Sequence, residues 1–202
     1  MPINNKPIFQ EYVSPEEVND LPLTAYEGKI ILIQEADKIK EAVEELSKFP
    51  VIGFDTETKP AFVKGQFYSI SLIQLAIPGK VFLFRLNHSG FTQPLIDLFS
   101  NEKILKVGVG LRDDILGLQK LHDFEPGGFK ELHDYVVELG VRNTGLRKLA
   151  AILLKVRISK GQQTSNWENS VLSKNQQVYA ATDAWICLEM FNLLQEKGFI
   201  YQ

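Results

Sequence analysis

Two carboxylates follow directly on a short apolar run, and no other feature of the sequence constrains the fold as much. Val51-Ile52-Gly53-Phe54 has the length and composition of a buried β-strand, and it continues into Asp55-Thr56-Glu57. Because side chains alternate along a strand, Asp55 and Glu57 point to the same face. Open α/β sheets bind ligands at the carboxyl ends of their strands. The pair is therefore either part of a solvated loop or one wall of a ligand site.

Apolar periodicity elsewhere predicts an α/β fold. Residues 29–202 are expected to form one domain with a mixed five- to six-stranded sheet and helices on both faces. Residues 1–28, interrupted by four prolines, are expected to form an N-terminal arm with one helical turn after Ser14-Pro15. The expected strands cover 30–33, 51–54, 69–77, 81–84 and 104–107, and the expected helices 36–48, 93–100, 111–122, 132–139, 145–155 and 173–197.

A second acid interrupts the apolar face of a predicted helix. At about 100° per residue, Leu111, Ile115 and Leu118 share one face, and Asp114 lies within the same stripe, whereas Asp113 points away from it. A buried carboxylate is costly unless it is paired, hydrogen-bonded or bound to a metal. The preceding Gly108 and Gly110 lack the third glycine of a dinucleotide-binding loop, which argues against a nucleotide-dependent oxidoreductase.

A third site lies on the last predicted helix. Tyr179 and Asp183 are four residues apart, so they are neighbours on one helix face, and that face continues through Ile186 and Met190. A Tyr–Asp pair at the rim of the core would explain this pattern, and so would a ligand site. If the acids of all three segments meet at one point, their mutual repulsion requires cations. Ligands that offer only oxygen favour Mg²⁺ or Mn²⁺, and pairs of such ions are suited to phosphodiester hydrolysis.

These segments together resemble a known family. Asp-x-Glu at a strand end (55–57), an Asp after Val-Gly-Val-Gly (107–114) and Tyr-x-x-x-Asp (179–183) are similar to the three motifs of DEDD-superfamily 3′–5′ exonucleases of the tyrosine subclass. The chain resembles the Werner-syndrome-type exonuclease domain and, more distantly, RNase D. Supporting matches occur at 52–55, 72–75, 106–110, 165–167 and 179–184.

The resemblance implies an RNase H-like fold and a role for each acid. Asp55, Glu57, Asp114 and Asp183 would hold two divalent cations, Mg²⁺ or Mn²⁺, and Tyr179 would orient the attacking water. Four further residues are candidates for substrate contacts. Thr56 and Leu75 would touch the terminal nucleotide, Trp167 would either pack beneath the site or stack on a base, and Arg147 belongs to a basic stretch, 142–160, that would contact phosphates.

The expected substrate is the 3′ end of DNA, with RNA trimming in the manner of RNase D as the alternative. DNA is favoured because only about 20 residues follow Asp183, which leaves no room for the helical C-terminal domains usual in RNase D-like enzymes. A helicase or repair protein acting in trans is a possible partner. An inactive nucleic-acid-binding module is the competing class, but no ligand acid is replaced.

Net charge, apolar runs and cysteine count indicate where the protein is expected to work and do not decide its function. The formal net charge is −3, and two divalent cations would bring it to +1, so charge does not decide for or against nucleic acid. No run of 18 or more apolar residues and no signal-peptide pattern occur, so no membrane association is expected. A single cysteine, Cys187, is typical of a cytoplasmic protein.

Overall fold

A six-stranded sheet forms the centre of the protein, with the strand order β1-β4-β3-β2-β5-β6. The computed structural model describes residues 8–63 and 65–200. Pairing is antiparallel between β2 and β3 and between β3 and β4, and parallel between β1 and β4, β2 and β5, and β5 and β6. The strands are β1 (Lys29–Ile33), β2 (Val51–Thr58), β3 (Ile70–Ile77), β4 (Lys80–Arg85), β5 (Leu105–Gly108) and β6 (Phe129–Glu131).

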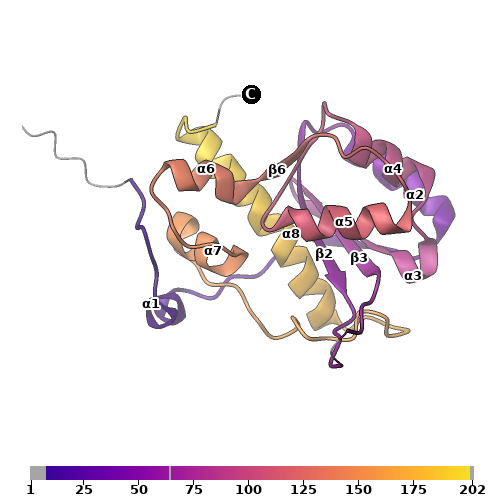
Figure 1. The fold of residues 1–202 in the computed structure, drawn as a ribbon, viewed down its shortest axis with the longest axis horizontal. Helices are drawn as coiled ribbons and strands as arrows, with labels where there is room; N and C mark the ends of the chain where they lie inside the picture. Colours follow the sequence, from indigo (N-terminus) through magenta and orange to yellow (C-terminus); the bar gives the residue numbers. More distant parts are fainter. Residues whose placement is uncertain (1–7, 64, 201–202) are drawn as a thin grey trace, which may run out of the picture.

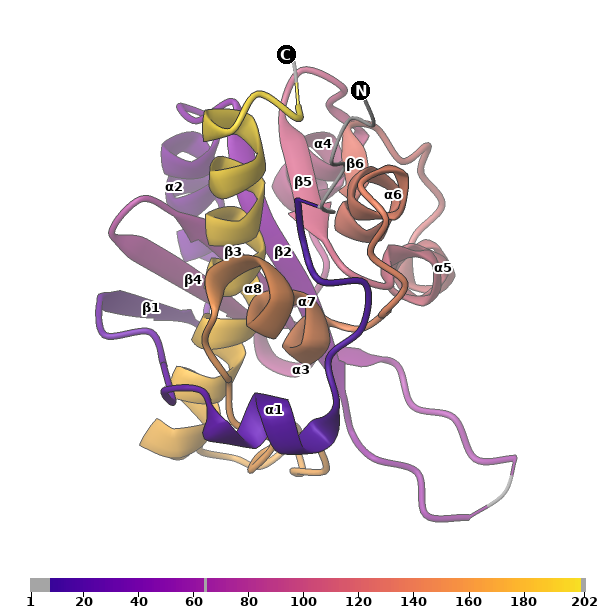
Figure 2. The same ribbon diagram turned by 90° about the vertical axis from the view of Figure 1, so that its left-hand side faces the viewer.

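Helices cover both faces of this sheet (Figures 1 and 2). Two separate hydrophobic clusters, one on each face, hold the layers together. The first face packs against α1 (Pro15–Asp20), α6 (Leu132–Glu138), α7 (Leu146–Leu154) and α8 (Lys174–Glu196). The second packs against α2 (Ala36–Leu46), α3 (Leu86–Ser89), α4 (Gln93–Ser100) and α5 (Leu111–Leu121). The RNase H-like α/β fold expected from the sequence is confirmed.

The central position of β2 and β3 follows from their composition. Every residue of β3 is buried, and the first four residues of β2 are buried as well. A strand that is buried on both faces reads as a nearly continuous apolar run, which is the pattern of Ile70–Ile77. Helix α8 is buried along most of its length, between the sheet and α7. The end of β2 and the middle of α8 therefore lie in the best-packed part of the molecule.

The N-terminal segment packs onto the domain. The helical turn expected after Ser14 is present as α1, and its first turn carries a capping box between Ser14 and Glu17. Phe9, Val13 and Tyr26 are buried, and Val13 N donates to Asn143 Oδ1 at 2.7 Å. Residues 8–28 thus run along the face that α8 covers. The part of the expected arm at residues 1–7 lies outside the described residues.

Two short elements, α3 and β6, were not expected from the sequence alone, and neither was the parallel pairing of β6 with β5. β6 has only three residues, Phe129–Glu131, which is too short for a periodic pattern to be recognised. Across the described ranges, no helix combines the length and the apolar character needed to cross a bilayer.

Candidate active site

Three carboxylates meet where β2 ends and the middle of α8 passes over it. Asp55, Glu57 and Asp183 each place a carboxylate oxygen within 4.8 Å of the other two. Asp55 and Glu57 share the face of β2 that α8 covers, as alternation along the strand predicts. The acids therefore come from residues more than 120 positions apart in the sequence, and only the folded domain brings them together.

A backbone contact sets the distance between these two elements. A Cβ on Gly53 would lie 2.1 Å from the carbonyl oxygen of Ala184, which no side chain can tolerate. Only glycine at position 53 allows β2 to approach α8 so closely. Because Gly53 precedes Asp55 by two residues and Ala184 follows Asp183 directly, this contact fixes the separation of the two acids.

Asp114 approaches from the opposite face of the sheet, on the first turn of α5. Its carboxylate accepts a short hydrogen bond from the Thr56 hydroxyl, so Thr56 joins Asp114 to the strand that carries Asp55 and Glu57. Asp114 is partly buried and Asp113 is exposed, as the helical pattern predicts. Asp114 lies outside the group of three acids within 4.8 Å, on its edge.

The glycine pair before α5 has a structural explanation that involves no dinucleotide. A Cβ on Gly108 would lie 2.7 Å from the carbonyl oxygen of Phe54, and Gly110 adopts φ +80°, a left-handed conformation that glycine accepts without strain. Glu131 then holds the start of α5, because its Oε2 accepts from the backbone nitrogens of Gly110 (2.7 Å) and Leu111 (3.0 Å). These contacts orient the helix turn that presents Asp114.

Tyr179 lies one turn before Asp183 on α8 and beside the acid cluster. Burial, followed by the charges of Asp183 and Glu57, raises the pKa of the Tyr179 phenol, so it stays a neutral hydrogen-bond donor. Trp167 packs against it with a ring-centroid distance of 6.0 Å. Arg147 is close enough to lower the pKa of Asp183, and its Nε donates to the Ile158 carbonyl at 3.0 Å.

Burial raises the pKa values of all four acids, and repulsion by neighbouring acids of the cluster adds to the shift at Asp55 and Glu57. Burial, then Asp183 and Asp114, raise the pKa of Glu57 to about 9. Burial raises the pKa of Asp114 to about 6, against the opposing hydrogen bond from Thr56. The pKa of Asp55 is raised well above its ordinary range by burial and by its three acidic neighbours, and burial also raises the pKa of Asp183.

The acids of this cluster are arranged as ligands for divalent cations. The cluster brings together the carboxylates of Asp55, Glu57, Asp114 and Asp183, and the positive charge of Arg147 lowers the pKa of Asp183. Neighbouring carboxylates without a cation are unfavourable in a buried site. The donors are all oxygen atoms, a set suited to Mg²⁺ or Mn²⁺ rather than to softer metals.

Two of the expected substrate contacts are not available on the surface. Leu75 is fully buried, and it packs in the cluster on the face of the sheet away from α8. Trp167 is fully buried as well, so it supports Tyr179 from behind and has no exposed face on which a base could stack. Thr56 and Arg147 remain partly exposed beside the acids. For Trp167, burial agrees with packing beneath the site, the first of the two expected roles, and the nucleotide contact of Leu75 stays a prediction that its buried position does not support.

Sequence reasoning also missed two residues that support the site. Glu131 also caps α6, because its side chain accepts from His133 N at 3.2 Å. Glutamate is not among the residues preferred at an N-cap, so the sequence gives no signal for this role. Arg85 is fully buried at the end of β4, where its guanidinium donates to the carbonyls of Ser170 (2.8 Å) and Asn169 and to Gln34. It holds the loop that carries Trp167. No pattern in an apolar strand signals such a role.

Comparison with known proteins identifies the family. A family model described as 3′–5′ exonuclease matches residues 30–198, which is most of the chain. The chain belongs to the 3′–5′ exonuclease family. Among curated relatives of this family, the mouse bifunctional 3′–5′ exonuclease/ATP-dependent helicase WRN is 34% identical over 193 residues, covering 89% of this chain and 14% of that protein. Human exonuclease 3′–5′ domain-containing protein 2 is 32% identical over 180 residues, covering 81% and 29%.

Solved structures of an EXO domain and of an exoribonuclease share the fold. The Nibbler EXO domain of Aedes aegypti superimposes with a TM-score of 0.76 at 25% identity and covers 87% of this chain and 91% of that one. Escherichia coli RNase D, an exoribonuclease involved in structured RNA processing, gives a TM-score of 0.72 at 20% identity, covering 85% and 47%. The chain spans less than a third of each of the two curated relatives above but nearly all of the solved Nibbler domain. The DEDD-superfamily resemblance is confirmed.

Proposed function

We propose that this protein is a 3′–5′ exonuclease that removes nucleotides from the 3′ end of DNA with two divalent cations, Mg²⁺ or Mn²⁺. One observation carries the proposal: the carboxylates of Asp55 and Glu57 on β2 and of Asp183 on α8 meet beside a neutral tyrosine. Asp114 of α5 lies at the edge of this group and is tied to β2 by Thr56. The four acids Asp55, Glu57, Asp114 and Asp183 would hold the cations. Membership of the 3′–5′ exonuclease family supports the same activity.

The residues divide the chemistry between them. Asp55, Glu57, Asp114 and Asp183 would hold divalent cations, which would neutralise the charge of the scissile phosphate and favour ionisation of the attacking water. The Tyr179 hydroxyl, held by Trp167 behind it and Asp183 beside it, orients that water. Thr56 fixes Asp114 in place, and Arg147 stands where it can meet a phosphate oxygen. A phenol suffices for orientation because no proton has to leave it.

DNA is the proposed substrate, and RNA is the alternative that a specific similarity favours. The mouse relative couples its exonuclease to a helicase in one protein, which is consistent with an exonuclease that works beside strand-separating partners. Trypanosoma brucei RNase D has been solved with the RNA U12 on a similar fold, at a TM-score of 0.72. The acids act on the phosphodiester and not on the sugar, so they serve both polymers. A helicase or repair partner in trans and a cytoplasmic location both stay predictions.

Degradation of 5′-labelled DNA and RNA oligonucleotides of the same sequence tests this function. With Mg²⁺ or Mn²⁺ the wild type is expected to give a ladder that shortens from the 3′ end, and EDTA is expected to stop it. Asp114→Asn should abolish the ladder, whereas Asp113→Asn, an exposed acid on the same helix turn, should not. The faster polymer identifies the substrate. An Asp114→Asn variant with wild-type activity would contradict the assignment of the acids.

A further inference from the structure

A buried arginine at the end of β4 contacts the segment that carries Trp167. Arg85 is fully buried, and its guanidinium donates to the carbonyls of Ser170 (2.8 Å) and Asn169 and to Gln34 Oε1 (3.1 Å). Among the residues that the structure describes, Arg85 forms no ion pair, and its Nε has no hydrogen-bond partner. Arg85 is thus a buried cation that only neutral oxygen atoms accompany.

Stability of the fold does not explain a cation at this position. A buried charge without an opposite charge costs free energy, and an apolar side chain of similar volume is often neutral or stabilising in its place. Asn169 and Ser170 are exposed, so water can satisfy their carbonyls without Arg85. What the hydrogen bonds of Arg85 add is a fixed position for this segment.

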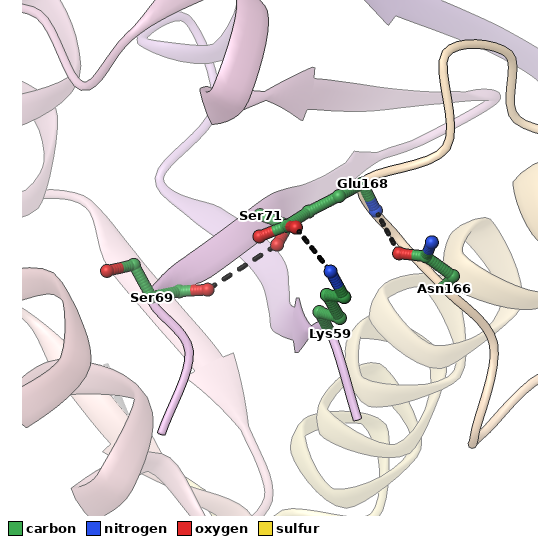
Figure 3. Close-up of polar contacts among 5 residues, drawn as sticks. All are labelled: Lys59, Ser69, Ser71, Asn166 and Glu168. Atoms are coloured by element: carbon green, nitrogen blue, oxygen red, sulfur yellow. Dashed lines mark hydrogen bonds and ion pairs between the residues drawn. The ribbon is translucent and has the colours of Figure 1, made fainter. Parts of the chain in front are cut away.

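The segment is a turn, residues 166–169, that its own hydrogen bonds close around Trp167. Glu168 N donates to Asn166 Oδ1 at 3.1 Å, and Asn169 N donates to the Asn166 carbonyl at 3.3 Å. Figure 3 shows the first of these bonds, together with Lys59, whose Nζ lies 3.3 Å from Glu168 Oε2. Because the turn is closed in this way, a shift at Asn169 moves Trp167 with it.

Trp167 connects this turn to Tyr179. The Trp167 ring is fully buried, and its centre lies 6.0 Å from the centre of the Tyr179 ring. Gln176, in the first turn of α8, also joins the helix to the turn, because its Nε2 donates to the Asn166 carbonyl at 3.2 Å. Protein interiors are close-packed, so a tryptophan that moves leaves space into which its neighbour moves. A displacement of about 1 Å at a catalytic site can lower a rate by about 100-fold.

We propose that Arg85 is a positioning residue for the reaction: it fixes the turn at 166–169 and, through Trp167, the place of the Tyr179 hydroxyl. The proposal rests on the proposed exonuclease function and adds a residue that lies outside the acid cluster. Arginine suits this role because its rigid fork presents two nitrogen atoms in fixed directions, to Asn169 and to Ser170. The ammonium of a lysine is a single point with rotatable donors.

Cleavage kinetics and thermal unfolding of Arg85→Met separate positioning from folding. On a labelled oligonucleotide, kcat should fall by about tenfold with KM within about twofold, because only the orientation of the water changes. Tm should not fall, because methionine removes a buried charge and keeps much of the volume. Arg85→Lys should recover only part of kcat. Lys59→Met removes a partly exposed cation from the same turn; as the matched control it should keep kcat within about twofold.

A double-mutant cycle tests whether Arg85 acts through Tyr179. Once Tyr179→Phe has removed the hydroxyl, Arg85→Met should change kcat by less than about twofold. A second readout needs no activity. Trp185→Phe leaves Trp167 as the only tryptophan, and acrylamide should quench its fluorescence more strongly when Arg85→Met is added. A wild type that cleaves nothing would refute the exonuclease function, whereas this quenching would still report on the link between Arg85 and Trp167.

Three results would overturn the role of Arg85. An Arg85→Met variant with the kcat and the quenching of the wild type would show that the turn keeps its place without the guanidinium. A loss of kcat that is equal with and without the Tyr179 hydroxyl would separate Arg85 from Tyr179. A Tm that falls by more than about 4 °C together with kcat would make Arg85 a residue of the fold and not of the site.

Discussion

Replacing Glu57 with glutamine should stabilise the metal-free protein while it removes activity. The pKa of Glu57 is raised from 4.5 to about 9, chiefly by burial and then by Asp183 and Asp114. At pH 7.5 the folded protein holds a proton on this group, or loses it at a cost, whereas the unfolded chain ionises freely. With 1.36 kcal/mol per pKa unit, the free energy of unfolding is lower by about 4 kcal/mol than for an unperturbed acid.

The gain from Glu57→Gln should be smaller than this figure, because neighbouring acids share the same repulsion. A gain of about 2 kcal/mol is expected, which corresponds to about 4–8 °C in Tm for a domain of this size. The difference in stability between the glutamine variant and the wild type depends on pH. The folded-state pKa is raised, so the stability that Glu57 contributes is fully present below pH 4.5 and is lost as pH rises towards 9. The advantage of the glutamine variant should therefore grow across this range.

Thermal unfolding in EDTA between pH 5 and 9 measures this difference, with Asp113→Asn as the control for loss of an exposed acid. Adding Mg²⁺ should reverse the order, because a cation at 100 times its Kd stabilises the wild type by about 2.7 kcal/mol and the variant binds it poorly. A glutamine variant that is less stable than the wild type in EDTA at every pH would refute the reasoning. So would a difference that does not change with pH.

Three further predictions follow from the same geometry. Mg²⁺ affinity should rise with pH between about 6 and 9, and binding should release protons, since the pKa values of Asp114 and Glu57 are raised to about 6 and about 9. Calorimetry in two buffers with different ionisation enthalpies detects the released protons. Equal heats of binding in the two buffers would contradict proton release. Tyr179→Phe should lower kcat by about 100-fold with KM within about threefold, measured at saturating substrate, because only the orientation of the water is lost. Gly53→Ala should destabilise the fold by about 3 kcal/mol in urea unfolding and remove activity, since its Cβ would lie 2.1 Å from the Ala184 carbonyl oxygen; a variant with wild-type stability would show that β2 and α8 can separate without loss.

Much of the catalytic cluster could be predicted because its acids break regular patterns. Alternation along 51–57 placed Asp55 and Glu57 on one face, and helical spacing separated Asp114 from Asp113; the structure has both arrangements. The strands other than β6 were predicted for the same reason, since their apolar runs are long enough to be read. Local periodicity is thus sufficient to predict where a side chain points when its direction depends only on the helix or strand that carries it.

Contacts between elements could not be predicted in this way. Arg85 lies in an apolar strand with no acid near it in sequence, yet it is fully buried and held by carbonyls of a loop more than 80 residues away. Leu75 was expected at the nucleotide because the matching motif includes it, but its strand places it on the opposite face of the sheet. The close approach of β2 and α8 at Gly53 could not be predicted either, because a glycine within a strand can have several structural roles. Tertiary packing decides all three.

The division of the site between β2 and α8 also bears on the time at which activity can begin. Asp55 leaves the ribosome before Asp183, and the strands β3 to β6 and the helices α5 and α7 lie between them in the sequence. Until α8 is made and docks against Gly53, a growing chain holds its first two acids without their partners. A ribosome-bound chain that has not yet made α8 therefore cannot assemble the cluster of three acids. Any truncation before α8 would leave a protein that is inactive, whatever else of the domain has folded.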